Sequence, residues 1–382
     1  MLDPATAVAK AEVSAAAVST ALSKAAADAR GIRTAEIIIT ETAGAQAYES
    51  VLPASLFAGD PKQVIRLVTA IGTIELPGNM FEARLTAGSS STVSVVIGLA
   101  DAAAISDPSL RESTSGKPVI ELTAKVDGKA IEWNNKNAPV KVSVPYTPKQ
   151  NQFNNSEHLV VWYIDPAGKA AKIPNTRYNM VEGSVTFSTT HFSKFAVSSV
   201  FKTFADAAKF TWGQQSIEAL ASKGVINGIS DTSFAPEASI TRADFLVLLV
   251  RGLGLTVGFS DNFSDVSPAK YYYEALGIAR ELGITGGAGN NLFKPDTPIS
   301  RQELMVLGSR AISLSGAAIP AGSADDIRKF SDRSEVAAYA VTDVAAMVKE
   351  GIVTGSGSKL NPHANATRAE AAVIMFRIIN KL

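Results

Sequence analysis

Three arginines, each directly after a hydroxyl residue, form the clearest chemical pattern in the sequence. These box arginines, with the residues before them, are Thr241-Arg242, Ser300-Arg301 and Thr367-Arg368. An acid follows each hydroxyl residue by three positions, which is typical of a helix N-terminus. Free backbone N–H groups there, together with a guanidinium, would bind an anionic or polyhydroxylated ligand. Alternatively, each arginine pairs with a recurring aspartate and fixes a loop to the helix.

An aspartate, an aromatic residue and a glycine accompany each box arginine at nearly fixed spacing. The aspartates are Asp206, Asp265 and Asp332, the aromatics are Trp212, Tyr271 and Tyr339, and the glycines are Gly228, Gly287 and Gly355. Each aromatic either belongs to a core or stacks on a sugar ring. Because the whole set recurs three times, a shared kind of ligand site is the favoured interpretation.

The tripeptide His191-Phe192-Ser193 offers a second, separate chemistry. It resembles the cleavage site of certain autoproteolytic sandwich domains, in which serine attacks the preceding carbonyl with histidine as the base. That reaction needs a strained peptide and an oxyanion donor. A sequence shows neither, so an ordinary strand residue followed by a polar turn is favoured over self-cleavage at Phe192-Ser193.

Composition excludes several other functions. The 382 residues contain no cysteine and three scattered histidines, which argues against thiol catalysis, iron–sulfur clusters and transition-metal sites. Lys+Arg and Asp+Glu balance at 36 each, so no overall field attracts nucleic acid. No phosphate-binding loop, nucleophile elbow or glycosidase carboxylate pair stands out. We therefore expect no cofactor, no metal site, no nucleic-acid partner and no enzymatic activity beyond the self-cleavage considered above.

The chemical residues lie in three repeats at the C-terminal end. Phe204-Ala205-Asp206 recurs as Phe263-Ser264-Asp265 and as Phe330-Ser331-Asp332, and each phenylalanine precedes its hydroxyl residue by 37 positions. The repeats begin 59 and then 67 residues apart. In the third repeat the aromatic and the glycines fall one position later. These landmarks define units at 203–261, 262–328 and 329–382.

Each repeat predicts two helices that position its chemical residues. The first helix ends at Gly224, Gly283 or Gly351, and a loop follows with Phe234, Phe293 or Leu360 as its apolar anchor. The hydroxyl residue then caps a second, strongly apolar helix. One helix pair cannot bury its own apolar face, so the three repeats must pack on one another.

The N-terminal half has a different period. Residues 4–29 are rich in alanine and predict one helix, within a lead-in at 1–33. Residues 34–202 predict a β-sandwich-like domain. Its strands are expected at 36–40, 64–76, 92–99, 119–126, 140–146, 159–164, 185–189 and 195–200, with hairpin turns at Asp127-Gly128 and Pro166-Ala167-Gly168. The fold class is therefore multidomain, β followed by α.

No membrane insertion is expected, because no run of 18 apolar residues occurs. The start of the chain lacks the basic and apolar regions of a signal peptide. We therefore expect that an export signal, if the protein has one, lies upstream, and that Met1 begins a fragment of a longer protein.

The repeats resemble the S-layer homology (SLH) domain, three in tandem over residues 203–382. The resemblance rests on FAD…W…GVINGISDTSFAPEASITRAD and its two echoes. It implies an α-helical, pseudo-threefold trimer that anchors a secreted bacterial surface protein non-covalently to a secondary cell wall polymer, usually one bearing pyruvylated N-acetylmannosamine. By this resemblance the glycan-binding residues are the twelve named above, four in each repeat. The second repeat departs with Ser-Arg-Gln-Glu, and the third with Ala366 and Leu360, so the grooves need not be equal.

The segment from Val140 to Val197 resembles a sandwich module that often precedes such repeats in bacterial surface proteins. This resemblance implies an extracellular location at the cell wall or S-layer, with the sandwich as spacer or array contact. Two alternatives stay open. The chain is the C-terminal anchor of an extracellular enzyme of the glycoside hydrolase type, or it is an adhesin or self-assembly module that acts through the β-domain.

Overall fold

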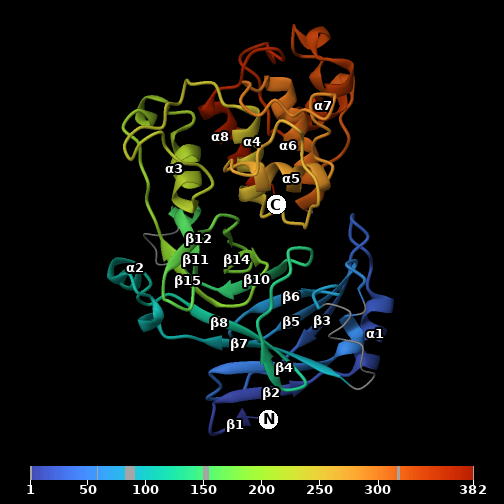
Figure 1. Ribbon diagram of the computed structural model, residues 1–382, viewed down its shortest axis with the longest axis vertical. Coiled ribbons are helices and arrows are strands. Elements are labelled where there is room, and N and C mark those ends of the chain that lie inside the picture. Colours follow the sequence, from blue (N-terminus) through green and yellow to red (C-terminus); the bar gives the residue numbers. More distant parts are fainter. Residues whose placement is uncertain (1, 58, 82–90, 149–154, 316–318, 382) are drawn as a thin grey trace. The chain divides into compact units, whose positions relative to one another are not determined.

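The computed structural model describes residues 2–57, 59–81, 91–148, 155–315 and 319–381. The chain divides into two compact units, Met1–Val200 and Phe201–Leu382. Strands dominate the first unit and helices the second (Figure 1). This bears out the expected combination of a β-rich N-terminal part and an α-helical C-terminal part.

The described residues of the N-terminal unit form two sheets. The larger sheet has nine strands in the order β1-β2-β4-β7-β8-β15-β11-β12, with β9 paired to β8. Its strands are β1 Leu2–Asp3, β2 Val8–Glu12, β4 Ala47–Pro53, β7 Thr92–Leu99, β8 Val119–Val126, β9 Lys129–Ile131, β11 Leu159–Ile164, β12 Ala170–Ile173 and β15 Lys194–Ser199. The smaller sheet has the order β13-β14-β10-β6-β5-β3. Its strands are β3 Arg33–Ile38, β5 Gln63–Val68, β6 Thr73–Pro77, β10 Val140–Pro145, β13 Arg177–Asn179 and β14 Ser184–Thr189.

The two sheets share one apolar core. Phe187 on β14 and Phe195 on β15 place their ring centroids 4.9 Å apart, which joins the smaller sheet to the larger. Both rings are buried, and the cluster around them draws residues from both sheets. Alternate residues of β4 are buried, as the period of two along a strand requires. Sheets that meet through such a core form a sandwich.

The N-terminal segment differs from the single helix predicted for residues 4–29. Val8–Glu12 forms β2, which pairs in parallel with β4, and only Ala15–Lys24 forms a helix, α1. Val18 and Leu22 of α1 are buried in the sandwich core. The alanine-rich pattern misled because alanine is also tolerated in a strand whose backbone pairs with a neighbour, and tertiary pairing overrides a weak local preference. The segment 1–33 therefore belongs to the β-rich unit.

The turns of the sandwich account for a second difference. The strand expected over residues 64–76 is two strands, β5 and β6, joined by a turn in which the Thr69 hydroxyl accepts from the Gly72 amide at 3.1 Å. The hairpin expected at Asp127-Gly128 is present between β8 and β9, with φ of 48° and 77° at the two residues. These left-handed angles are those of a tight two-residue hairpin turn.

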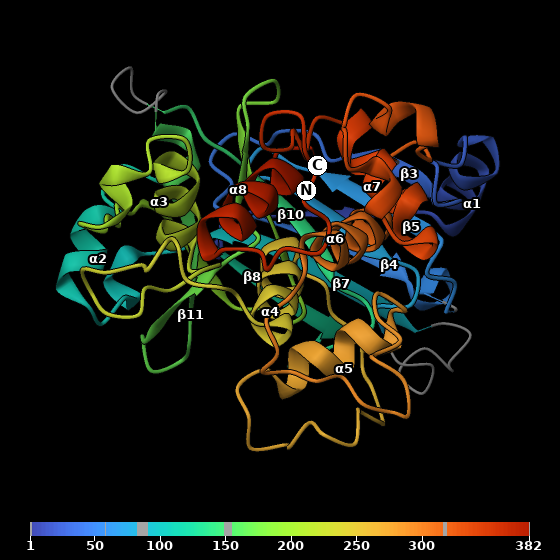
Figure 2. The ribbon, with the colours of Figure 1, turned by 90° about the horizontal axis from the view of Figure 1, so that it is seen from above.

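The helices of the C-terminal unit are arranged as an inner and an outer set. The inner helices are α4 Arg242–Leu253, α6 Arg301–Ser315 and α8 Arg368–Ile379, and the outer helices are α3 Gln214–Lys223, α5 Tyr273–Glu281 and α7 Val341–Lys349. The inner helices contact one another pairwise. Figure 2 shows them side by side, with the outer helices around them. The outer helices of the second and third repeats pack on the inner helix of the repeat before them, α5 on α4 and α7 on α6. The outer helix of the first repeat, α3, packs on α8 of the third, which closes the circle.

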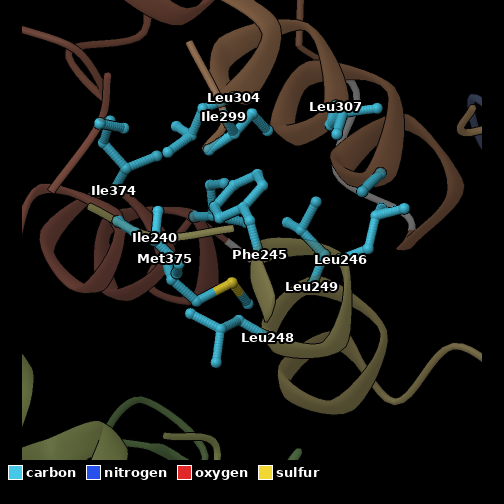
Figure 3. Packing of buried hydrophobic residues seen from close by; sticks show 14 of the residues in the cluster. Ile240, Phe245, Leu246, Leu248, Leu249, Ile299, Leu304, Leu307, Ile374 and Met375 are labelled. Atoms are coloured by element: carbon cyan, nitrogen blue, oxygen red, sulfur yellow. The ribbon is translucent and has the colours of Figure 1, made fainter. Parts of the chain in front are cut away.

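Leucine, isoleucine and phenylalanine side chains from the three inner helices fill the centre of this unit. Figure 3 shows Phe245 and Leu249 of α4 facing Leu304 of α6 and Met375 of α8. All four side chains are almost fully buried. The outer helices end where the sequence predicted, because Gly224, Gly283 and Gly351 adopt left-handed φ angles between 70° and 74°. The second helix of each repeat thus begins at the box arginine and packs in a core that the three repeats share.

The remaining described helix of more than one turn is α2, Pro108–Ser113, in the N-terminal unit. Across the described ranges, none of the helices has both the length and the apolar character that crossing a bilayer requires.

Candidate ligand grooves

The box arginines join each repeat to the next. Their Nε–H groups donate to the carbonyl of the neighbouring loop's apolar anchor: Arg242 to Phe293 at 3.0 Å, Arg301 to Leu360 at 2.7 Å, and Arg368 to Phe234 at 2.9 Å. The guanidinium of Arg242 also lies over the Phe293 ring, and that of Arg368 over the Phe234 ring. The arginines therefore fix loop to helix, as one alternative expected, but across repeats and through carbonyl groups.

The recurring aspartates hold the same loops from within their own repeat. Asp206 accepts from the amides of Phe234 and Ala235, both at 2.8 Å, and from the Ser233 hydroxyl. Burial alone would raise the pKa of Asp206, but these hydrogen bonds outweigh it and lower the pKa below its usual value. Asp265 and Asp332 accept two loop amides each in the same way. The predicted pairing of aspartate with box arginine is not among the ion pairs of the described residues.

The amide groups at the start of the inner helices are occupied. The amides of Arg242 and Ala243 donate to the carbonyls of Thr297 and Pro295 in the next repeat, both at 3.0 Å. The other two inner helices repeat this arrangement. The expectation of free helix N-terminal amides for an anion is therefore wrong, because the neighbouring loop fills that position. A ligand would meet side chains and loop edges instead.

The loop glycines have a steric reason to recur. A Cβ on Gly355 would lie 2.5 Å from Cε1 of Phe330, and one on Gly287 would lie 2.6 Å from Cε1 of Phe263. A Cβ on Gly228 would come equally close to Phe204. In each repeat the loop thus crosses the ring of the phenylalanine that opens the repeat, and only glycine fits there.

The three aromatic side chains lie at the surface. Trp212, Tyr271 and Tyr339 are exposed to 58%, 68% and 59% respectively. A large ring left this open does not serve the core. Of the two roles weighed for these residues, the structure excludes a core role and leaves an open face for a ligand.

Residues from all three repeats meet in a groove of about 190 Å³, the first groove. The first repeat supplies the loop Val225–Gly228 together with Asp244 and Arg251, the second supplies Tyr271, and the third supplies Arg368. The Tyr271 hydroxyl donates to Asp244 at 2.5 Å. Partial desolvation of the hydroxyl and this hydrogen bond raise the pKa of Tyr271, so the hydroxyl stays a donor at neutral pH. Burial lowers the pKa of Arg368 from its usual high value.

Another groove, of about 210 Å³, has the same plan with the repeats permuted. We call it the third groove because its loop comes from the third repeat. Its loop, Ile352–Ser356, comes from the third repeat, its aromatic Trp212 from the first, and its box arginine Arg301 from the second. The remaining set forms the second cluster, in which Tyr339 lies near Glu303, Arg242 and Arg310. The structure thus brings every predicted aromatic beside a box arginine of another repeat.

Sequence reasoning missed a second arginine in each set. Arg251 lines the first groove and Arg377 the third, and Arg310 belongs to the second cluster. All three follow their box arginine by nine positions, so the repeat alignment contained the signal. It also missed three acids that cap the inner helices: Asp244 lines the first groove, Glu370 lines the third groove, and Glu303 lies near Tyr339 in the second cluster.

The residues considered for self-cleavage lie in the N-terminal unit. The Ser193 hydroxyl donates to the carbonyl of Ile164 at 2.8 Å, and the His191 ring packs against Tyr163 with centroids 4.4 Å apart. Burial lowers the pKa of His191. The hydroxyl is therefore directed at a neighbouring strand. That the chain stays uncleaved at Phe192-Ser193 remains a prediction, which the mass of the purified chain can test.

The repeat geometry agrees with a comparison against known families. Residues 203–246, 262–305 and 329–372 each match the S-layer homology domain. The C-terminal part of the chain carries three tandem SLH domains. Their matched spans begin at the phenylalanine-aspartate motif and end within the inner helix, so they contain the loop and the box arginine.

Curated relatives are of two kinds. The amylopullulanase of Thermoanaerobacterium thermosulfurigenes is 31% identical over 64% of this chain and 13% of its own length. The exoglucanase XynX of Acetivibrio thermocellus is 32% identical over 47% of this chain and 16% of its own. The surface-layer 125 kDa protein of Lysinibacillus sphaericus is 29% identical over 45% and 14%. The chain therefore spans less than a fifth of the length of these relatives, and the first match extends beyond the SLH domains into the N-terminal unit.

Proposed function

We propose that this chain anchors a bacterial surface protein to the cell wall by binding a secondary cell wall polymer in the grooves between its SLH domains. One observation carries the proposal: Tyr271 and Trp212 each lie in a groove with a box arginine and a loop from the other two repeats, and Tyr339 lies near the box arginine Arg242. An open ring offers a stacking face for a sugar, and a guanidinium binds a carboxylate through paired hydrogen bonds. The protein would act outside the cell, at the wall or S-layer.

The ligand that fits best is a glycan with a carboxylate close to a pyranose ring. The pyruvylated N-acetylmannosamine implied by the SLH resemblance has this chemistry, because its ketal places a carboxylate on the sugar. Several such units along one polymer would engage several grooves of one chain. Linked binding of this kind raises retention well above the affinity of a single site.

The three SLH domains would form a pseudo-threefold trimer. Two observations support this arrangement: the inner helices contact one another pairwise, and each box arginine reaches the loop of the next repeat so that the third returns to the first. The ligand surfaces would then lie at three equivalent positions around the axis.

Co-sedimentation with purified cell wall tests the anchor. We expect the chain to bind wall that retains its secondary polymer and to lose binding when the polymer is removed chemically. Replacing Trp212, Tyr271 and Tyr339 together by Ala should weaken binding without unfolding the protein, because all three rings are exposed. Val181→Ala, at a residue exposed to 96% in the N-terminal unit, is the matched control. Binding that survives stripping would move the ligand to peptidoglycan, and no binding to intact wall would refute the anchor.

A second candidate places this chain within an extracellular glycan-degrading enzyme. Relatives named amylopullulanase and exoglucanase favour it. In that case the chain would hold the enzyme at the wall, and the full-length gene would encode a catalytic domain outside these residues. The sandwich would act as spacer in either case. If it makes array contacts instead, residues 1–200 alone would form oligomers that grow with concentration.

A further inference from the structure

The acids that cap the inner helices differ in length among the three SLH domains. The second and third have Glu303 and Glu370, whereas the first has Asp244. Glu303 accepts from the Arg242 guanidinium at 2.5 Å while its other oxygen binds the Ser300 cap. Glu370 does the same for Arg301, with its other oxygen on the Thr367 amide. In these two places the box arginine is therefore already paired with a carboxylate.

The first groove lacks this pairing. Asp244 is one methylene shorter, and its oxygens accept from the Thr241 hydroxyl at 2.8 Å and from the Tyr271 hydroxyl at 2.5 Å. In the described ranges of the chain, no carboxylate lies within ion-pair distance of Arg368. Its Nε and Nη2 donate to the Phe234 and Asn227 carbonyls, which leaves Nη1 available.

The box arginine without a carboxylate partner, Arg368, is also the most exposed of the three. Arg242 and Arg301 are each only 7% exposed, whereas Arg368 is partly exposed and lines the first groove. Arg251 lines the same groove, and within the described residues its guanidinium makes no hydrogen bond or ion pair. Its counterparts are engaged: Arg310 with Asp343 at 3.7 Å and Arg377 with the Ile352 carbonyl at 3.0 Å. Two guanidinium groups without a carboxylate partner thus face one pocket.

We infer that the first groove is the anion site of the trimer, where Arg368 and Arg251 bind the carboxylate of the ligand. At Arg242 and Arg301 the protein's own glutamate already pairs with the guanidinium, and a ligand carboxylate would have to displace that glutamate. The length of the capping acid therefore sets which groove binds the anion first. This inference rests on the proposed function, since it ranks the grooves through which the chain would hold its polymer.

Exchange of the capping acids tests the ranking, with acetate as the minimal carboxylate probe. The Nε–H signals of the arginines, assigned through single Arg→Lys variants, are followed by NMR during the titration. In the unaltered chain acetate should shift Arg368 and leave Arg242 and Arg301 in place. Asp244→Glu should weaken acetate binding at Arg368 about tenfold, the size of a charge-assisted hydrogen bond. Glu303→Asp should make Arg242 respond, and Glu370→Asp serves as its matched counterpart at Arg301.

Three results would overturn the ranking: equal responses at all three box arginines, no effect of Asp244→Glu, or no response at any arginine. Wall co-sedimentation of the same variants separates this inference from the anchor. If acetate binds at Arg368 but the chain does not bind wall, the anchor fails and the anion site stands. If the chain binds wall and Asp244→Glu changes neither readout, the ranking alone fails.

Discussion

Replacing Gly355 by Ala should destabilise the SLH unit far more than the same change at Gly351. Both glycines belong to the third repeat and have similar left-handed φ angles, 74° at Gly355 and 70° at Gly351. They differ in their surroundings. A Cβ on Gly355 would lie 2.5 Å from Cε1 of Phe330 and 2.7 Å from the Lys359 carbonyl oxygen, whereas a Cβ on Gly351 meets nothing within 4 Å.

The magnitude follows from two separable costs. A left-handed φ at a residue with a Cβ costs about 1 kcal/mol, and both variants bear this cost. The contact with Phe330 adds about 2 kcal/mol at Gly355, since overpacking a well-filled site costs about 1–3 kcal/mol. The Phe330 ring is almost fully buried and cannot turn away into solvent. We therefore expect losses of about 3 kcal/mol for Gly355→Ala and about 1 kcal/mol for Gly351→Ala.

Guanidinium unfolding followed by circular dichroism at 222 nm measures the difference, because six of the eight α-helices in the described residues, including the longest ones, lie in the C-terminal unit. Because the chain divides into two compact units, a transition for each unit is included in the fit. Equal shifts of the midpoint in the two variants would refute the steric argument. The loop glycines would then recur for another reason, of which direct contact with the ligand is the first to test.

Three further predictions concern the aspartates and a half-buried arginine. Asp332→Ala should cost about 2 kcal/mol, because it leaves the buried Leu360 amide without its acceptor, whereas Asp325→Ala, at an exposed position of the short 3-10 helix Ala324–Ile327, should be neutral; chemical unfolding of both variants checks this. Hydrogen bonds lower the pKa of Asp206 and Asp332 below 3.8, so their contribution is present above that value and lost as the pH falls through the lower folded value. The unfolding midpoint of the SLH unit should therefore drop in acid, and it should drop less when both aspartates are replaced by Asn. Arg177 has a buried Nε without a hydrogen-bond partner, and burial lowers its pKa to about 10. Arg177→Met should leave the stability of the sandwich unchanged or raise it by up to about 1 kcal/mol, and a calorimetric loss of 2 kcal/mol or more would contradict this.

Two parts of the fold could be predicted from the sequence: the three repeated units, and the strands in which apolar and polar residues alternate. Strands such as Thr92–Leu99 and Val119–Val126 coincide with their predicted bounds, since β-branched residues and flanking turns mark both ends. The segment Val8–Glu12 could not be predicted in this way. Its five residues, VAKAE, have no strong β preference, and what makes them a strand is parallel pairing with Ala47–Pro53. Local sequence holds no record of such a distant partner.

The types of the site residues could be predicted, but not how they combine. Spacing predicted that Arg368 and Tyr271 belong to equivalent sets, yet they come from different repeats and meet at a loop of another. That combination depends on each outer helix packing on the inner helix of the preceding repeat. The shorter acid, Asp244, was visible from the start as a helix cap. Its effect on Arg368 appears only when the longer glutamates are seen to cross to the neighbouring arginine.

The box arginines cannot by themselves separate binding from folding. Each one donates to the loop of the next repeat, and Arg242 and Arg301 are buried while doing so. Replacing them by Ala would remove an interaction between repeats together with any ligand contact, so loss of wall binding would have two explanations. The exposed aromatics and the capping acids reduce this difficulty, because Tyr271→Ala removes an exposed ring that meets the core at Tyr272, and Asp244→Glu preserves charge. A test of anchoring should therefore begin with the rings, and a test of groove preference with the acids.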